Sequence, residues 1–408
     1  MDAYQLRDTL AGDFEAIFEL LSDAFAATDI DDQREAERLT FEPSRCHVIV
    51  HGGRIVGSAG AYSRELTIPG SIVPAAHVSM VSVEPTHRRR GLLNRLMSHQ
   101  LRSVSESIAV LWASEGRIYQ RYGYGMATRT ASLRINGREV ALLPSVPSAV
   151  GTLRSAVPAH VRKELSEVYS RVRAERPGLS GRSETWWEHV TSDASSRRNG
   201  YTAKRAVLHE DADGNVTGYA IWRAKSEWDD GGGPNGDAQV LELIAVNPEA
   251  YTALWRFLLA VDLTRTVTAR LASVDEPLFY LVNEARQLGM RVGDGLWLRI
   301  VDLPAALADR RYAAPLDVVI DVTDPLLEQN AGRWRLRVAE DGSATCERTG
   351  DQADLACHIA DLGASYLGGT PLTHLGLAGR VTELRPGALA AASTAFGWHA
   401  TPTSIEIF

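Results

Sequence analysis

The sequence predicts an α/β protein built from more than one domain. Apolar segments with strand periodicity alternate with amphipathic helical segments, one strand–helix unit occurs twice, and the pattern changes near Leu303. A chain of 408 residues has room for two or three domains at about 150 residues each. We therefore expect a succession of α/β units along the chain.

The composition is that of an ordinary globular protein. Hydrophobic residues make up 45% of the chain, charged residues 23%, and the net charge is −8. This charge argues against general nucleic-acid binding, which needs a basic face. Neither an apolar run of about 18 residues nor a secretory signal pattern is found, so no membrane association is expected. The scattered cysteines Cys46, Cys346 and Cys357 favour a reducing cytoplasm, and no cysteine or histidine spacing predicts a metal site.

The N-terminal part alternates helices and strands. Apolar residues from Phe14 to Phe25 recur at helical spacing, so residues 13–27 are expected to form a helix. The acidic stretch 28–37 is expected to be irregular, either solvated or forming a pocket wall that attracts cations. A helix is expected after Gly91, with its apolar residues on one face. Strands are expected at 47–50, 54–61, 64–68, 77–83 and 108–114.

The middle part repeats the beginning after a proline-containing linker at 140–158. A strand at 240–246, Asn247-Pro248 and an apolar helix repeat the strand, Val-x-Pro, helix order of residues 79–101, which indicates an internal duplication. The second copy lacks the Arg-Arg-Arg-Gly turn of the first. Other helices are expected near 158–175 and 183–192, strands at 203–209 and 216–228, and an exposed loop at 229–237.

The C-terminal part has its own pattern. Alternating strands are expected at 316–322, 334–338 and 355–359, followed by short helices separated by glycines. The chain ends in the strand-like segment 403–408. Ile405, Ile407 and Phe408 are too apolar for a dangling tail, so we expect this segment to dock on the protein.

The segment Val81–Asn94 has the strongest functional signal. A strand leads into a helix through the turn Arg88-Arg89-Arg90-Gly91. The first turn of a helix presents unpaired N–H groups and a positive dipole end, and a glycine there lets a phosphate approach closely. The turn can therefore hold a pyrophosphate, although its spacing is not that of a Walker loop. A solvated basic turn is the alternative, and DNA binding is disfavoured because the arginines begin an apolar helix.

This segment resembles the acetyl-CoA-binding motif of the GNAT N-acetyltransferases, with Leu93 in place of the small residue usual at the motif's end. The resemblance becomes more specific with THRRRGLL (86–93), ASEG-x-IY-x-R-Y-GYG (113–125), GLWLRI (295–300) followed by PAAL (304–307), and a terminal phenylalanine. Together these segments look like the Eis (enhanced intracellular survival) family and cover the whole chain.

The resemblance implies two fused GNAT-type mixed sheets with flanking helices and a C-terminal sterol-carrier-protein-like α/β domain. It implies an acetyl-CoA-binding GNAT domain at 1–145, a second GNAT-like domain without the cofactor motif at 150–300, and the sterol-carrier-like domain at 301–408. Acetyl-CoA is the implied co-substrate. The residues implied to bind it are Val81, Ser82, Val83, Arg88, Arg89, Arg90, Gly91, Leu92, Leu93, Asn94, Ser114 and Glu115.

The resemblance also implies the chemistry, N-acetylation of amines. Tyr119 takes the role of general acid, the terminal carboxylate of Phe408 that of the base, and a backbone N–H near Val81 stabilises the oxyanion. The alternatives are a core aromatic at Tyr119 and a frayed terminus at Phe408. Glu406 and the acidic stretch around Asp29, Asp31 and Asp32 are the alternative bases.

Aminoglycosides, lysine side chains and polyamines are the implied acceptors, and a homohexamer is the implied assembly. Ile407 stands where the family has an acidic residue, and Glu406 would point to the opposite face of a strand. The acceptor range is therefore open. A non-enzymatic acyl-CoA-binding or lipid-binding protein is the alternative function, and the intact Tyr119 and arginine turn argue against it.

Overall fold

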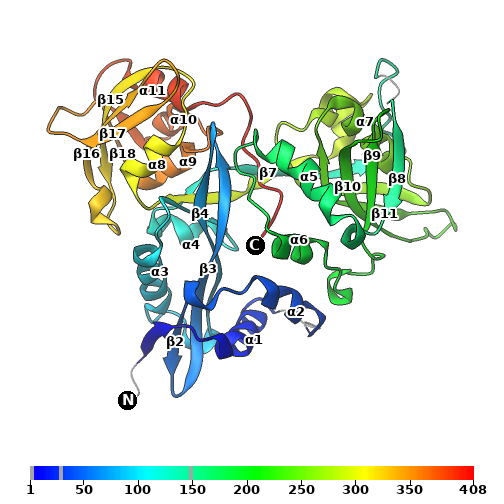
Figure 1. Cartoon of the computed structure of the whole chain (residues 1–408), viewed down its shortest axis with the longest axis horizontal. Helices are drawn as coiled ribbons and strands as arrows, with labels where there is room; N and C mark the ends of the chain where they lie inside the picture. Colours follow the sequence, from blue (N-terminus) through cyan, green and yellow to red (C-terminus); the bar gives the residue numbers. More distant parts are fainter. Residues whose placement is uncertain (1–3, 27–30, 147–149) are drawn as a thin grey trace.

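The computed structural model describes residues 4–26, 31–146 and 150–408. Three β-sheets, each with its own helices, form three bodies around the C-terminus (Figure 1). This arrangement confirms the α/β class and the presence of several units. None of the helices in the described ranges combines the length and the apolar character that crossing a bilayer requires.

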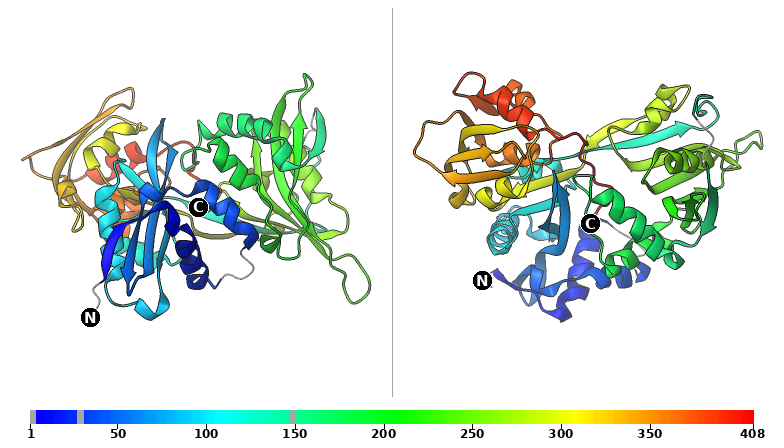
Figure 2. Two further views of the ribbon diagram at one scale, coloured as in Figure 1. Left: turned by 60° about the horizontal axis from the view of Figure 1, so that its bottom comes forward. Right: turned by 45° about the horizontal axis from the view of Figure 1, so that its top comes forward.

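The first sheet is formed largely by the N-terminal third, with strand order β1-β2-β3-β4-β5-β14-β6. Helix α3 covers one face because its apolar residues, from Leu92 to Leu101, share one side of the helix. Helix α1 covers the other face (Figures 1 and 2). The bounds are β1 Gln5–Asp8, β2 Cys46–His51, β3 Arg54–Ile68, β4 Ser71–Val83, β5 Ile108–Trp112, β6 Gly125–Met126, β14 Leu296–Ile300, α1 Phe14–Ala24, α2 Asp31–Thr40, α3 Leu92–Ser103 and α4 Gly116–Tyr119.

The second sheet has strand order β13-β7-β12-β11-β10-β9-β8. As in the first sheet, one parallel pair, β11 with β12, lies within otherwise antiparallel neighbours. The bounds are β7 Arg129–Asn136, β8 Thr152–Ala156, β9 Arg205–Glu210, β10 Val216–Lys225, β11 Gly236–Ala245, β12 Thr264–Ala272, β13 Arg291–Asp294, α5 Arg162–Arg173, α6 Glu184–Thr191 and α7 Pro248–Leu259.

The two sheets exchange strands. Strand β7 follows the first unit in sequence but pairs with β12 and β13 of the second sheet. Strand β14 ends the second unit but lies between β5 and β6 of the first sheet. The crossing strands run between the two bodies (Figure 2). The predicted ranges 1–145 and 150–300 stay a prediction, and each sheet contains one strand that comes from the other range.

The third body packs closely on the first sheet. Its sheet has the order β17-β16-β15-β18-β19, and its core is continuous with apolar residues of β3, β5 and β14. A Cβ atom at Gly125 of β6 would lie 1.9 Å from the Ala360 carbonyl oxygen of α9, so only glycine permits this contact. The bounds are β15 Leu316–Thr323, β16 Gly332–Val338, β17 Ala344–Arg348, β18 Leu355–His358, β19 Val381–Glu383, α8 Leu303–Asp309, α9 Ile359–Ser365, α10 Leu372–Leu377 and α11 Ala388–Phe396.

Three sequence expectations differ from the structure. The acidic stretch is not irregular where it is described: residues 31–40 form α2, most of whose residues are the good helix formers Gln, Arg, Glu, Ala and Leu. Residues 27–30 lie outside the described part. The linker contains β8, which pairs with β9 at the edge of the second sheet. The final segment, 403–408, joins no sheet and instead contacts both GNAT-like units.

Candidate active site

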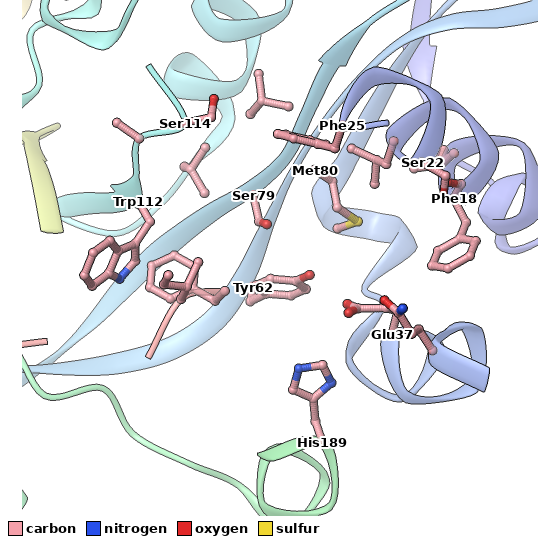
Figure 3. Close-up of a pocket in the computed structure, with 18 of the residues that line it drawn as sticks. Phe18, Ser22, Phe25, Glu37, Tyr62, Ser79, Met80, Trp112, Ser114 and His189 are labelled. Carbon is pink, nitrogen blue, oxygen red and sulfur yellow. The ribbon is translucent and has the colours of Figure 1, made fainter. Parts of the chain in front are cut away.

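A cavity of about 610 Å³ lies beside strand β4 of the first sheet. Its walls come from α1, α2, β3, β4, the segment after β5, α6 and the last two residues of the chain (Figure 3). Four predicted site residues, Val81, Ser114, Tyr119 and Phe408, all line it. Fold and docked terminus therefore bring together residues that are distant in sequence.

Strand β4 has a bulge where it borders the cavity. Met80 and Val81 lie opposite the single residue Ala59 of β3, and Met80 adopts a φ of 53°, which is uncommon for a residue with a side chain. The parallel pairing of β4 with β5 is confined to Ala76–His77 against Ala109–Val110. The two strands therefore separate beyond this point, and the Met80–Val81 peptide groups lie outside the regular ladder beside the cavity.

The arginine turn leads from β4 into α3. Arg89 and Gly91 have positive φ values of 61° and 78°, and the Arg88 Nε donates to the Val83 carbonyl oxygen at 3.2 Å. No side chain caps the start of α3, and a Cβ added at Gly91 would meet nothing within 4 Å. Free amides, a glycine and exposed arginines at one helix start fit a pyrophosphate.

The other predicted cofactor residues lie around this turn. Ser82 and Val83 are buried at the end of β4, and Leu92 packs into the core beneath α3. Arg90 donates to the Tyr4 hydroxyl at 2.8 Å. Leu93 is half-buried, and the exposed residues are Arg88, Arg89, Arg90, Gly91, Asn94, Ser114 and Glu115.

Tyr119 is the last residue of α4, and its side chain is largely buried at the cavity wall. Burial, with a smaller contribution from the neighbouring Tyr122 phenol, raises the pKa of Tyr119 to about 12. The phenol is therefore protonated at neutral pH. A protonated hydroxyl at the wall of a cavity can donate a proton to a leaving group.

The C-terminal segment is docked. The Thr403 amide donates to the Pro177 carbonyl oxygen at 2.9 Å, and the Phe408 ring lies 4.7 Å from the His77 ring between centroids. Figure 1 places the C-terminus beside α6, between the first and second units. The terminal residue is thus part of the cavity wall and not a frayed end.

Two arginines hold this segment through Glu406. Its carboxylate forms ion pairs with Arg64 of β3 and, at 2.6 Å, with Arg182 of the loop before α6. Both guanidinium side chains are 1% exposed, and Arg182 also pairs with Glu242 of β11 at 2.6 Å. Burial alone would raise the pKa of Glu406, but the two arginines hold it at about 2.

Glu406 is therefore not an acceptor contact or a base. It does not line the cavity, and both of its oxygens are used by arginines. Asp32 also fails as a base, since it accepts hydrogen bonds from Ser196 and Ser195 that hold its pKa at about 2. Asp29 and the Asp31 side chain lie outside the described residues. From the acidic stretch, Glu37 does line the cavity, paired with Arg197.

His189 of α6 lines the cavity and was not predicted. Its ring points toward Glu37 and Tyr62 in Figure 3. Its Nδ1 lies 3.0 Å from the Ala36 carbonyl oxygen, so this nitrogen donates and leaves Nε2 as an acceptor. Only the tertiary structure brings this helix to the first sheet, so no sequence spacing could have indicated it.

One group of potential metal ligands was also not predicted. The ligand atoms of Asp8, His47 and His99 lie within 4.8 Å of one another, with His47 Nδ1 at 3.0 Å from the Asp8 carboxylate. None of the three lines the cavity, so this group is separate from the candidate active site.

The equivalent position in the second sheet is different. Beyond Val240 and Ala269, the parallel strands β11 and β12 also separate, but Thr403 and Ile405 of the C-terminal segment line that opening. At the start of α7, the Asn247 side chain accepts from the Ala250 amide at 2.8 Å. This helix start is therefore already capped and lacks arginines.

Family models match all three parts of the chain. Residues 5–127 and 178–300 each match an acetyltransferase (GNAT) domain, and residues 303–404 match a sterol carrier protein domain. This confirms two GNAT units followed by a sterol-carrier-protein-like domain.

Relatives match over most of the length. An uncharacterized N-acetyltransferase of Streptomyces avermitilis is 42% identical over 96% of each chain. The N-acetyltransferase Eis of Mycobacterium tuberculosis is 33% identical over 81% of this chain and 80% of its own length. The crystal structure of Eis1 from Mycobacterium abscessus has a TM-score of 0.83 and 32% identity, covering 99% of this chain and 100% of that one.

Proposed function

Because this chain belongs to the Eis family of GNAT N-acetyltransferases, we propose that the cavity beside β4 is where it acetylates an amine. The observation that supports this most is the convergence of Tyr119, Phe408 and the Val81 bulge on one cavity. Acid, base and oxyanion donor are the groups that acetyl transfer to an amine needs.

In this proposal, acetyl-CoA supplies the thioester when bound. The first turn of α3 and Arg88–Arg90 hold its pyrophosphate, and Val81–Val83, Ser114 and Glu115 flank its arm where β4 and β5 separate. The Phe408 carboxylate takes a proton from the ammonium so that the neutral nitrogen forms the new C–N bond. The Val81 N–H donates to the oxygen of the attacked carbonyl, and Tyr119 gives its proton to the sulfur as the C–S bond breaks. The second proton, which the nitrogen loses as the amide forms, restores the Tyr119 hydroxyl.

The finer parts of the proposal rest on the family. Aminoglycosides acetylated at several amines, lysine side chains and polyamines are the acceptors it suggests, and a homohexamer is the assembly, which sedimentation equilibrium can test. We place the enzyme in the cytoplasm, and the three buried, unpaired cysteines are consistent with this location.

A thiol-release assay tests the function. Purified enzyme is mixed with acetyl-CoA and a panel of primary amines, and release of free CoA is followed together with the mass of each product. Amine-dependent release with a gain of one acetyl group supports the proposal. Acetyl-CoA binding without release for every amine would favour the alternative, a non-enzymatic acyl-CoA-binding protein.

One acetyl-CoA is expected to bind per chain. Only the first unit has the uncapped, arginine-rich helix start, whereas the second is capped by Asn247. Calorimetric titration should therefore give a stoichiometry of one, and Gly91→Val should weaken binding by roughly tenfold or more, since a side chain at positive φ is strained and blocks close approach. Two equivalent sites would contradict a structural role for the second unit.

Glu406→Gln is expected to release the C-terminal segment. The substitution replaces the buried carboxylate with a neutral amide and leaves the Arg64 guanidinium without its ion pair. The docked state of the segment is thereby destabilised by about 3 kcal/mol. Turnover should fall at least about tenfold because Phe408 is no longer held in place. Since the folded-state pKa is lowered to about 2, the ion pairs stabilise docking fully above pH of about 4.5 and are lost only as the pH falls toward 2.

Carboxypeptidase digestion provides a readout independent of activity. Removal of Phe408, followed by mass spectrometry, should be faster in Glu406→Gln than in wild type. Glu383→Gln, an exposed glutamate of β19 outside the cavity, is the matched control and should digest at the wild-type rate. Equal digestion of Glu406→Gln and wild type would mean that Glu406 does not anchor the segment.

A further inference from the structure

We propose that Asp8, His47 and His99 form a binding site for a divalent metal ion of the zinc type, apart from the cavity beside β4. Their ligand atoms lie within 4.8 Å of one another, and none of the three residues lines the cavity. Two imidazoles and one carboxylate are a donor set that Zn²⁺ accepts in proteins. Metal binding at this site is independent of the proposed acetyltransferase activity.

Three elements of the first unit bring these residues together. Asp8 ends β1, the edge strand of the sheet, and lies directly opposite His47 of β2. Residues opposite each other in an antiparallel pair have side chains on the same face of the sheet. His99 belongs to α3, and its ring meets the His47 ring edge to face, with 4.5 Å between the centroids. A metal ion bound here would therefore link the edge strand to its neighbour and to α3.

Hydrogen bonds determine which nitrogen of His47 carries a proton. Ser103 lies four residues after His99, on the same side of α3. The Ser103 hydroxyl donates to the Gln100 carbonyl oxygen at 2.8 Å. Because a hydroxyl has only one hydrogen, the Ser103 Oγ accepts from His47 Nε2, which lies 3.1 Å away. Nε2 is thus protonated, and Nδ1 of the neutral ring presents a lone pair.

This lone pair faces a carboxylate. An Asp8 carboxylate oxygen lies 3.0 Å from His47 Nδ1, so two acceptors are in contact unless a cation is bound to both. The cation is either a second proton on the ring or a metal ion. A second proton would charge a side chain that is 8% exposed and that touches a second imidazole, His99. A metal ion uses both imidazoles as neutral ligands and keeps Nε2–H directed at a hydrogen-bond acceptor, as in most metal-binding histidines.

The ligand atoms are close to the positions that zinc requires. Bonds of about 2.0–2.1 Å in a tetrahedral site place neighbouring ligand atoms about 3.3 Å apart, near the 3.0 Å between Asp8 and His47. The Asp8 side chain is 82% exposed, and His99 is also exposed, so both can rotate toward the ion. Within the described ranges, Asp8 has no ion pair besides His47, and the His99 ring nitrogens have no hydrogen-bond partner. Water would complete the four ligands.

The test uses metal-stripped, untagged, full-length protein titrated with zinc sulfate in a calorimeter. We expect saturable binding of one Zn²⁺ per chain. Since the unfolded chain does not hold the three ligands together, zinc at about 100 times its Kd should raise the Tm by roughly 5 °C. Co²⁺ should bind with the visible absorption of a tetrahedral complex, and Zn²⁺ should displace it. Mg²⁺ should not displace Co²⁺, because it prefers an octahedral shell of oxygen ligands.

Two substitutions at exposed positions locate the ion without disturbing the core. His99→Gln and Asp8→Asn each remove one ligand, and each should weaken zinc binding by roughly tenfold or more and abolish the rise in Tm. His160→Gln, an exposed histidine of the second unit, is the matched control and should bind zinc like the wild type.

Two results would overturn the site. Equal zinc affinity in wild type, His99→Gln and Asp8→Asn would mean that the ion is held elsewhere on the surface. No saturable binding by the wild type at micromolar zinc would leave a second proton on His47 as the cation that faces Asp8. Both readouts, metal binding and Tm, are obtained without acetyl-CoA, so they do not change if the proposed acetyl transfer fails.

Discussion

Tyr119→Phe is expected to lower turnover by roughly 10²-fold or more, the scale of a lost general acid. The substitution removes one hydroxyl group and little volume from a buried ring, so the fold and acetyl-CoA binding should persist. The pKa of Tyr119, raised to about 12 by burial, keeps the phenol protonated across the physiological range. Ionisation of Tyr119 should therefore not lower the turnover of the wild type until the pH approaches 12.

Tyr122→Phe is the matched control. Tyr122 lies three residues further on, is buried in the same core, and does not line the cavity. Steady-state kinetics on both variants should show the large loss only for Tyr119→Phe, mainly in kcat. Turnover of Tyr119→Phe within a few-fold of wild type would remove the phenol from the mechanism and leave protonation of the thiolate to water.

The fold class was predictable because local signals and global structure agree here. Helical spacing in α1 and α3, strand periodicity in β2 and β3, and the repeated strand–helix unit each depend on short segments. The apolar side of such a segment must face the core in the folded protein, so its periodicity alone indicates the element. The arginine turn is equally local, which is why its position at the start of α3 is confirmed.

The strand exchange was not predictable from the same signals. Strands β7 and β14 have the periodicity of ordinary strands, and nothing in either segment specifies which sheet it joins. Pairing partners distant in sequence are fixed by side-chain packing across the whole sheet. Gly125, which contacts the Ala360 carbonyl oxygen, is a partial signal in the sequence. A glycine within a strand indicates that another backbone approaches closely, but it does not identify that backbone.

The composition of the site was predictable only in part. Tyr119, Val81 and Ser114 lie in motifs that identify them individually, and the apolar end of the chain predicts that it docks. Glu406 was an alternative base in the sequence analysis, and in the structure it forms ion pairs with Arg64 and Arg182. Those arginines come from β3 and from the loop before α6, and only the packed structure brings them together.

A C-terminal extension is expected to abolish amine acetylation while acetyl-CoA still binds. Adding even a few residues after Phe408 converts its carboxylate into a peptide group, and every side chain of the protein stays the same. The arginine turn and the β4 bulge are formed by other segments, so calorimetric titration should still give a stoichiometry of one. The same residues added before Met1 should leave turnover unchanged.

This experiment distinguishes the chemical role of the terminal carboxylate from the role of the side chains that anchor the segment. Protease cleavage at a site placed directly after Phe408 restores the native end, and activity should return with the expected change in mass.

If the extended protein is fully active, the base must lie elsewhere. Glu406 and Asp32 are excluded by their arginine and serine partners. His189 would then be the candidate, because its Nδ1 is held by the Ala36 carbonyl oxygen and its Nε2 is left to accept a proton. In that case His189→Gln, and not the extension, would abolish turnover.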